Sequence, residues 1–170
     1  MPQDLFLPTS MSLGFIAWGL IARWYVMPHW RGITRAAALI PQLLLHCFRF
    51  IGLAFLIPGV TNVPLDPRFA EPAAYGDLLA AVLALVAILA LRQRWAVATA
   101  LVWIFNVEGT LDLINAVARG LRYTQDGQLG AAYFIPAVIV PALLVSHVLI
   151  FILLLKREGG SEFPEGSRER

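Results

Sequence analysis

Residues 97–117 read VATALVWIFNVEGTLDLINAV, and this stretch decides the fold. It is long and apolar enough to cross a bilayer, yet it contains Glu108 and Asp112. Its aliphatic residues and Phe favour insertion by about 3 to 6 kcal/mol, whereas one central acid costs about 2.5 to 3.5 kcal/mol. Because the balance is marginal, we expect the segment to insert only if its acids face protein or water, or are protonated.

The composition of the whole chain indicates a protein that is solvated by lipid. Of the 170 residues, 59% are hydrophobic and 14% are charged, and the mean hydropathy is +0.72. The basic residues are spread over short polar breaks without a basic face, so we predict no nucleic-acid partner. Cys47 is the only cysteine, which excludes an intrachain disulfide and a Cys/His zinc motif.

Five runs approach the length of about 20 apolar residues that a membrane span requires. We therefore predict an all-α, polytopic integral membrane protein, a bundle of five transmembrane helices that forms a single unit over residues 1–157. The predicted spans are 11–27, 36–60, 74–91, 95–117 and 131–155. The polar segment 158–170 is predicted to be a disordered cytoplasmic tail.

Basic residues at the ends of the spans predict the orientation. They gather on one side of the predicted bundle, at Arg31, Arg35, Arg92, Arg94, Lys156 and Arg157. The positive-inside rule makes this side cytoplasmic, with the N-terminus outside and the C-terminus inside, and we expect a multi-pass protein of a bacterial inner membrane. On the outer side, the proline-rich segment 61–77 is predicted to be a non-helical loop.

Ionisable residues inside the predicted spans are the candidates for function, because hydrocarbon disfavours them elsewhere. Gln42, His46 and Arg49 follow i, i+4, i+7 spacing, so they share one helical face that must point inward. At a rise of about 1.5 Å per residue, Arg49 and Glu108 both lie about 20 Å from the cytoplasmic side, which predicts that they pair.

Two further acids complete the predicted charged layer. Asp112 lies about 6 Å further out than Glu108, where it can share the guanidinium or face a cavity that opens outward. Asp77 is predicted nearer the mouth of that cavity. Glu108 and Asp112 facing the single base Arg49 would leave a surplus negative charge, which a purely structural ion pair does not need.

His46 and His147 are predicted one layer deeper, with Asn106 between the two layers. Facing imidazoles can ligate a haem iron, relay protons or act as general acid and base. They can also simply hydrogen-bond within the bundle, and Ser146 is adjacent to His147. We predict no cofactor, and keep haem b as an alternative.

Small residues on the third span predict a close contact with a neighbouring helix. Gly76, Ala80, Ala84 and Ala87 lie on one stripe of that helix. Five spans in a chain of this size resemble the translocator proteins and the emopamil-binding, sterol-isomerase-like family. The sequence aligns with the motifs of neither, so no residues are carried over.

The leading hypothesis is an integral membrane protein whose charged pocket binds or transports a small solute, a proton or a lipid headgroup. Arg49 would face an anion, and Glu108 or Asp112 would accept a proton. The alternatives are a membrane-embedded enzyme on a lipid or isoprenoid with His46 or Glu108 as acid/base, a b-type cytochrome, and a subunit of a larger complex. The predicted partners are the lipid bilayer, a small polar or amphipathic ligand, and a second copy or another membrane subunit.

Overall fold

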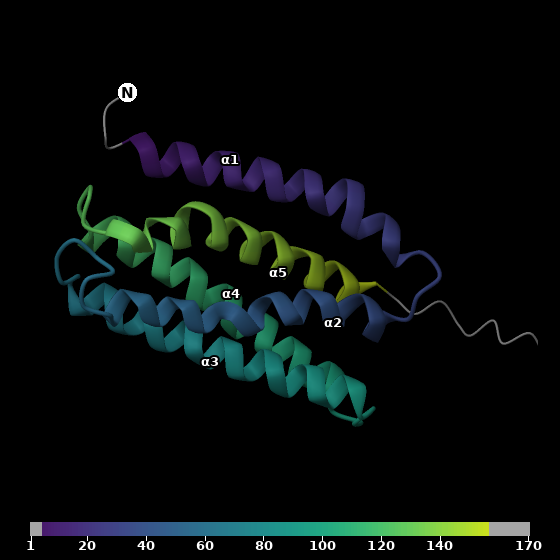
Figure 1. The fold of residues 1–170 in the computed structure, drawn as a ribbon. Helices are drawn as coiled ribbons and strands as arrows, with labels where there is room; N and C mark the ends of the chain where they lie inside the picture. The colour runs from purple at the N-terminus through teal and green to yellow at the C-terminus, as the bar shows by residue number, and fades with distance from the viewer. Residues whose placement is uncertain (1–4, 157–170) are drawn as a thin grey trace, which may run out of the picture.

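The computed structural model describes residues 5–156, and every element in that part of the chain is helical (Figure 1). The predicted tail 158–170 lies outside the described residues. The elements are α1 (Phe6–Ile21), η2 (Ala22–Val26), η3 (Met27–Trp30), α2 (Arg35–His46), η4 (Cys47–Leu56), α3 (Pro67–Arg92), α4 (Ala98–Tyr123), η5 (Gly130–Tyr133), η6 (Ile135–Ile139) and α5 (Val140–Leu155).

Four helical segments in the described chain are long and apolar enough to cross a membrane. They are Arg35–Leu56, Pro67–Arg92, Ala98–Tyr123 and Gly130–Leu155. The predicted span 11–27 corresponds to α1 and η2, and α1 by itself has 16 residues. Length and composition therefore indicate a multi-pass membrane protein.

Consecutive helices run antiparallel (Figure 1). The start of α2 and the end of α5 consequently meet at one end of the bundle, where Arg35 Nη2 donates to the carbonyl oxygen of Lys156 at 2.5 Å. The end of α3, with Arg92, lies at this end too (Figure 1). We call it the basic end, and the opposite end, with the loops 57–66 and 124–129, the distal end.

The first helix packs on the outside of the other four, mainly against η6 and α5 (Figure 1). A Cβ added to Gly14 would lie 2.8 Å from the carbonyl oxygen of Ala137, so a larger residue would push the helices apart. Trp18 Nε1 donates to the carbonyl oxygen of Val138 at 3.1 Å. At the distal end Tyr133 Oη is 2.7 Å from Ser10 Oγ.

The helix α3 begins at Pro67, before the predicted span 74–91, so the prediction of a non-helical loop in the segment 61–77 is wrong from residue 67 onward, and the helix predicted from residue 74 starts earlier. Asp66 is the N-cap, and its side chain accepts from the backbone N–H of Arg68 at 2.9 Å. Pro67 fits the first turn, because the N–H it lacks would have no partner inside the helix.

Two apolar clusters fill the bundle, one in each half, and polar side chains lie between them. The cluster towards the basic end contains Leu43, Ala84, Phe105 and Ile150, all of them fully buried. The predicted small-residue face of α3 is confirmed by the burial of Ala80, Ala84 and Ala87, which are each 0% exposed. The cluster towards the distal end consists of Phe55, Leu65, Phe69, Ala70, Ala73, Leu113, Leu129, Ala132, Ile135, Val140 and Leu143.

Candidate functional site

Arg49 lies in the bundle interior and is only 1% exposed. Its Nε donates to Asp77 Oδ1 at 2.7 Å, and its Nη2 donates to Asp112 Oδ2 at 2.5 Å. Nη1 donates to the carbonyl oxygen of Gly109 at 3.1 Å. One guanidinium on η4 thus joins α3 and α4 through two ion pairs and a backbone hydrogen bond.

Glycines on neighbouring helices leave the space that the two carboxylates occupy. A Cβ added to Gly52 of η4 would lie 2.7 Å from the Cβ of Asp77 and overlap its carboxylate. A Cβ added to Gly76 of α3 would overlap the carboxylate of Asp112. Each acid therefore fits only because the facing helix has no side chain at that position.

Gly109 of α4 makes the corresponding space for the base. A Cβ there would lie 2.7 Å from Arg49 Nη1 and 2.8 Å from His147 Cε1. The arrangement is cyclic: η4, α3 and α4 each provide one glycine and one charged side chain, and each glycine accommodates the charge of another helix. We call the three charged residues, Arg49, Asp77 and Asp112, the charged cluster.

Glu108 does not have the position that the sequence predicted. The ion pairs of Arg49 in the described chain are with Asp77 and Asp112, so the predicted pair with Glu108 is wrong. Glu108 Oε2 is buried and accepts no hydrogen bond from any described residue. The side chain still interacts electrostatically with Arg49 and Asp77. The cause is the rotation of α4, which turns Gly109 and Asp112 towards η4.

His147 links the charged cluster to a second polar group, and its hydrogen bonds define its tautomer. Asn106 Nδ2 donates to the carbonyl oxygen of His147 at 3.2 Å, so Asn106 Oδ1 faces the imidazole and can only accept. His147 Nδ1 therefore donates to that oxygen at 2.7 Å. His147 Nε2 has a lone pair and lies 3.4 Å from Arg49 Nη1 as an acceptor. This neutral histidine adds no charge to the cluster.

His46 belongs to a separate hydrogen-bonded chain on the basic side of the cluster. Ser146 Oγ donates its single proton to Gln42 Oε1 at 3.1 Å. His46 Nε2 is consequently the donor in its 3.2 Å bond to Ser146 Oγ. His46 Nδ1 is then an acceptor that is buried without a partner among the described residues.

The two imidazoles do not fit the haem alternative. The ring centroids of His46 and His147 are 4.2 Å apart, close to the separation of about 3.5–4.0 Å at which carbon atoms touch. An iron atom bonded to both rings would have to lie between them, and there is no space for it. The described residues also contain no group of three or more His, Cys, Asp or Glu that could hold a metal ion.

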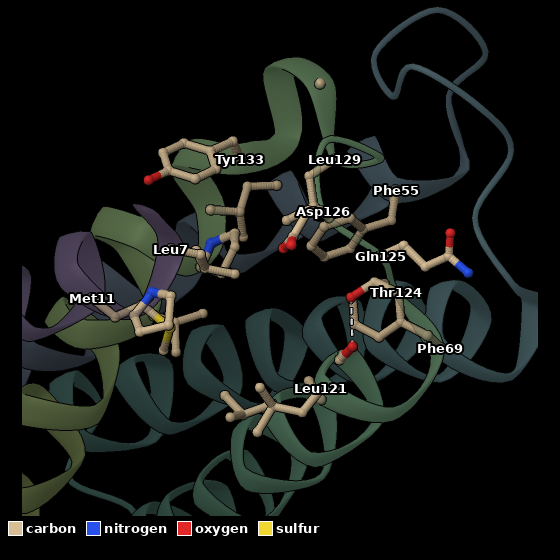
Figure 2. Close-up of a pocket in the computed structure, with 18 of the residues that line it drawn as sticks. Leu7, Met11, Phe55, Phe69, Leu121, Thr124, Gln125, Asp126, Leu129 and Tyr133 are labelled. Atoms are coloured by element: carbon tan, nitrogen blue, oxygen red, sulfur yellow. Dashed lines mark hydrogen bonds between the residues drawn. The ribbon is translucent and has the colours of Figure 1, made fainter. Parts of the chain in front are cut away.

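A cavity of about 680 Å³ lies at the distal end, between α1, α4 and the helices η4, η5 and η6 (Figure 2). Most of its walls are apolar, and Leu7, Met11, Phe55, Phe69 and Leu121 are among the side chains that line it. Its volume is in the range of small-molecule sites, about 300–1,000 Å³.

The polar groups of the cavity are acidic or neutral. Asp77 of the charged cluster lines it. The exposed Asp126 is a second acid in the lining (Figure 2). Asp77 uses Oδ1 for Arg49, while Oδ2 accepts no hydrogen bond from any described residue and the side chain keeps 11% of its surface exposed. Among the described residues, no Arg, Lys or His lines the cavity. The cavity therefore presents a carboxylate oxygen to whatever enters it.

The sequence thus predicted most members of the site but not their contacts. The inward face of Gln42, His46 and Arg49 is confirmed, with exposures of 8%, 0% and 1%. Asp77 was predicted near the mouth of the cavity, whereas the structure shows it in a direct ion pair with Arg49. Gly52 was not identified from the sequence. The pattern that could have identified it is a glycine within one helical turn of a charged residue inside a span, as at Gly76 and Gly109.

Residues 6–155 match a family described as a domain of unknown function, DUF8737. The match includes every residue of the charged cluster and all but the ends of the described chain. No curated protein and no solved structure matches the chain. The site geometry is therefore the basis for the function.

Proposed function

Because the chain belongs to the DUF8737 family, whose function is unknown, we propose from its own geometry that it binds a small amphipathic molecule in the distal cavity. The ligand has an apolar body, which lies against the cavity walls, and a small polar head, which reaches the charged cluster. The observation that carries this proposal is an apolar cavity of about 680 Å³ that is lined in part by the buried Asp77.

The membrane topology in this proposal has five spans, with the N-terminus outside and the C-terminus in the cytoplasm of a bacterial inner membrane. The first of these spans is the helix formed by α1 and η2, on which Leu13 is 61% exposed, Ile16 60% and Trp24 63%. Such side chains are favourable against lipid. The grouping of Arg35, Arg92 and Lys156 at the basic end supports a cytoplasmic location for that end. The distal cavity then opens on the outer side.

The apolar walls favour an amphipathic ligand over a small hydrophilic solute. Burial of hydrocarbon contributes about 25 cal/mol for each Å² removed from water, and a hydrophilic solute would forgo that contribution. The alternative of a lipid enzyme with His46 as acid/base would be favoured by a cleft beside His46. The cavity lies beside Asp77 instead, and His46 does not line it.

The test fills the cavity without touching the charged cluster. Ala116 lines the cavity, and Ala118, on the same helix, is exposed outside it. We expect native mass spectrometry of the wild-type protein, released from its own membranes, to show a bound amphiphile. An Ala116→Trp variant should lose that mass, and an Ala118→Trp variant should keep it. A mass that both variants retain, or a wild-type protein without any, contradicts the proposal.

A further inference from the structure

The charged layer contains more negative than positive groups. Arg49 supplies one positive charge, and its two ion-pair partners Asp77 and Asp112 supply two negative charges when both are ionised. Glu108 interacts electrostatically with all three. His147, whose Nε2 lies 3.4 Å from Arg49 Nη1, and His46, whose ring centroid lies 4.2 Å from that of His147, are titratable groups next to this layer, and the tautomers above make both neutral.

An unbalanced carboxylate inside a membrane protein is costly, so a proton or another cation must compensate it. Two acids line the cavity, the exposed Asp126 and the buried Asp77, and of these Asp77 is the one in the charged layer. The place for that cation is beside Asp77 Oδ2, which accepts no hydrogen bond from a described residue, and no described Arg, Lys or His lines the cavity to compete for this oxygen. Asp112, the other partner of Arg49, does not line the cavity, so the exchangeable position belongs to Asp77.

We propose, on the basis of the function above, that the ligand is a cationic amphiphile and that its head exchanges with a proton on Asp77. In the empty cavity the proton is bound to Asp77 Oδ2. When an ammonium head binds beside this oxygen, the proton leaves for water through the distal cavity and the carboxylate neutralises the ammonium. The total charge of the layer is the same in both states. Binding and proton release are therefore linked.

The experiment uses the full chain in nanodiscs of neutral phosphatidylcholine, with empty nanodiscs as the blank. The two probes are dodecyltrimethylammonium, whose charge is permanent, and dodecanol, which has the same chain and no charge. Binding is measured by equilibrium filtration from about pH 5 to about pH 9. Proton release is followed with an indicator dye in weakly buffered solution.

We expect the ammonium probe to bind more tightly as the pH rises, by up to about tenfold per pH unit, with release of about one proton per ligand. Dodecanol should bind with little dependence on pH. Asp77→Asn should remove both the pH dependence and the proton release while dodecanol binding persists. The matched control is Glu71→Gln, which removes an exposed acid from the same helix and should behave as wild type.

The outcomes separate this inference from the proposed function. If both probes bind equally at every pH without proton release, the exchange with Asp77 is contradicted and the cavity function stands. If an Asp77→Asn protein that still binds dodecanol also releases protons on ammonium binding, Asp77 is not the exchanging group. If neither probe binds to the wild-type protein above the blank, the proposed function itself fails.

Discussion

The two halves of the bundle differ in how their interior is packed: one half is filled by side chains, and the other contains a cavity. Towards the basic end, alanines of α3 allow leucines and Phe105 of the neighbouring helices to fill the interior, and Ala84 and Val102 are 0% exposed. Towards the distal end, the helices around Asp77 surround a cavity of about 680 Å³. The charged cluster lies at the boundary between the closed half and the hollow half.

The difference follows from the partners of α1. This helix packs on η6 and α5, and its first turns also line the cavity opposite α4 (Figure 2). Tyr133 fixes that position, since its hydroxyl contacts Ser10 Oγ and donates to the carbonyl oxygen of Phe6 at 3.1 Å. Because these contacts hold the first turns of α1 in place, the cavity remains open between α1 and α4. The cavity therefore results from the placement of α1 opposite α4 together with small residues in its lining, such as Ala116 and Gly120.

The largest effect is expected where the two halves meet. Arg49→Met leaves Asp77 and Asp112 buried without their cation, which should lower the free energy of unfolding by about 3–5 kcal/mol. Denaturant titration of the purified protein in detergent measures this. The triple variant with Asp77→Asn and Asp112→Asn as well should recover most of the loss, because no uncompensated charge remains. A triple variant as unstable as Arg49→Met would mean that charge balance does not control this boundary.

A slightly smaller effect is expected from closing the space beside the guanidinium. Gly109→Ala places a Cβ 2.7 Å from Arg49 Nη1, which should cost about 3 kcal/mol, the upper end of the usual range for overpacking. Gly19→Ala on α1 is the control, since no atom lies within 4 Å of the added Cβ. It should be neutral or stabilise by up to about 1 kcal/mol through helix propensity. Equal effects of both substitutions on the melting temperature would contradict the steric argument.

The same change, from Ala to Leu, at one position in each half compares the two halves directly. Ala84→Leu, in the closed half, should lower the free energy of unfolding by about 2 kcal/mol, because no space is available for three more carbon atoms. Ala116→Leu projects into the cavity and should change stability by less than about 0.5 kcal/mol, or increase it. Melting temperatures in the same detergent measure both. A loss at Ala116 as large as at Ala84 would show that the cavity collapses in the free protein.

The smallest effect concerns the distal surface. The hydrogen bond from the Arg68 guanidinium lowers the pKa of Asp66 to about 2, from about 3.9 in an unfolded chain. Because the folded pKa is the lower one, this contact stabilises the protein above about pH 4 and the contribution is lost as the pH falls through about 2. The melting temperature of wild type should slightly exceed that of Asp66→Asn at pH 5, and the difference should vanish near pH 2. A difference that grows on acidification would contradict the assignment.

The sequence was informative where helical periodicity decides the result. Spacing alone predicted the inward face of Gln42, His46 and Arg49, and hydropathy predicted four segments that the structure shows to be long and apolar enough to span a membrane. Counting depth along straight helices failed for the partner of Arg49. Counting residues along a helix accounts neither for the rotation of α4 about its axis nor for the length of the arginine side chain. The guanidinium of that side chain lies well away from its own Cα.

The cavity was the part that no sequence pattern could specify. It depends on contacts between residues far apart in the chain, such as Tyr133 with Ser10 and Trp18 with the carbonyl oxygen of Val138. The surplus of acids in the sequence predicted a charged pocket. It gave neither the size of the cavity nor the residues that line it. The volume of the cavity and its apolar walls follow from the tertiary arrangement of α1.

The cyclic arrangement of glycines and charges corresponds to a sequence pattern in this chain that can be read without any structure. Arg49 and Gly52 are three residues apart, Gly76 precedes Asp77, and Gly109 and Asp112 are again three apart. Written as R-x-x-G, G-D and G-x-x-D on three successive helices, the pattern has in each segment one charged residue and one glycine that makes space for a charge on another segment. A chain with all three segments is expected to build the same cluster, and one with a bulkier residue at any of the glycines is not.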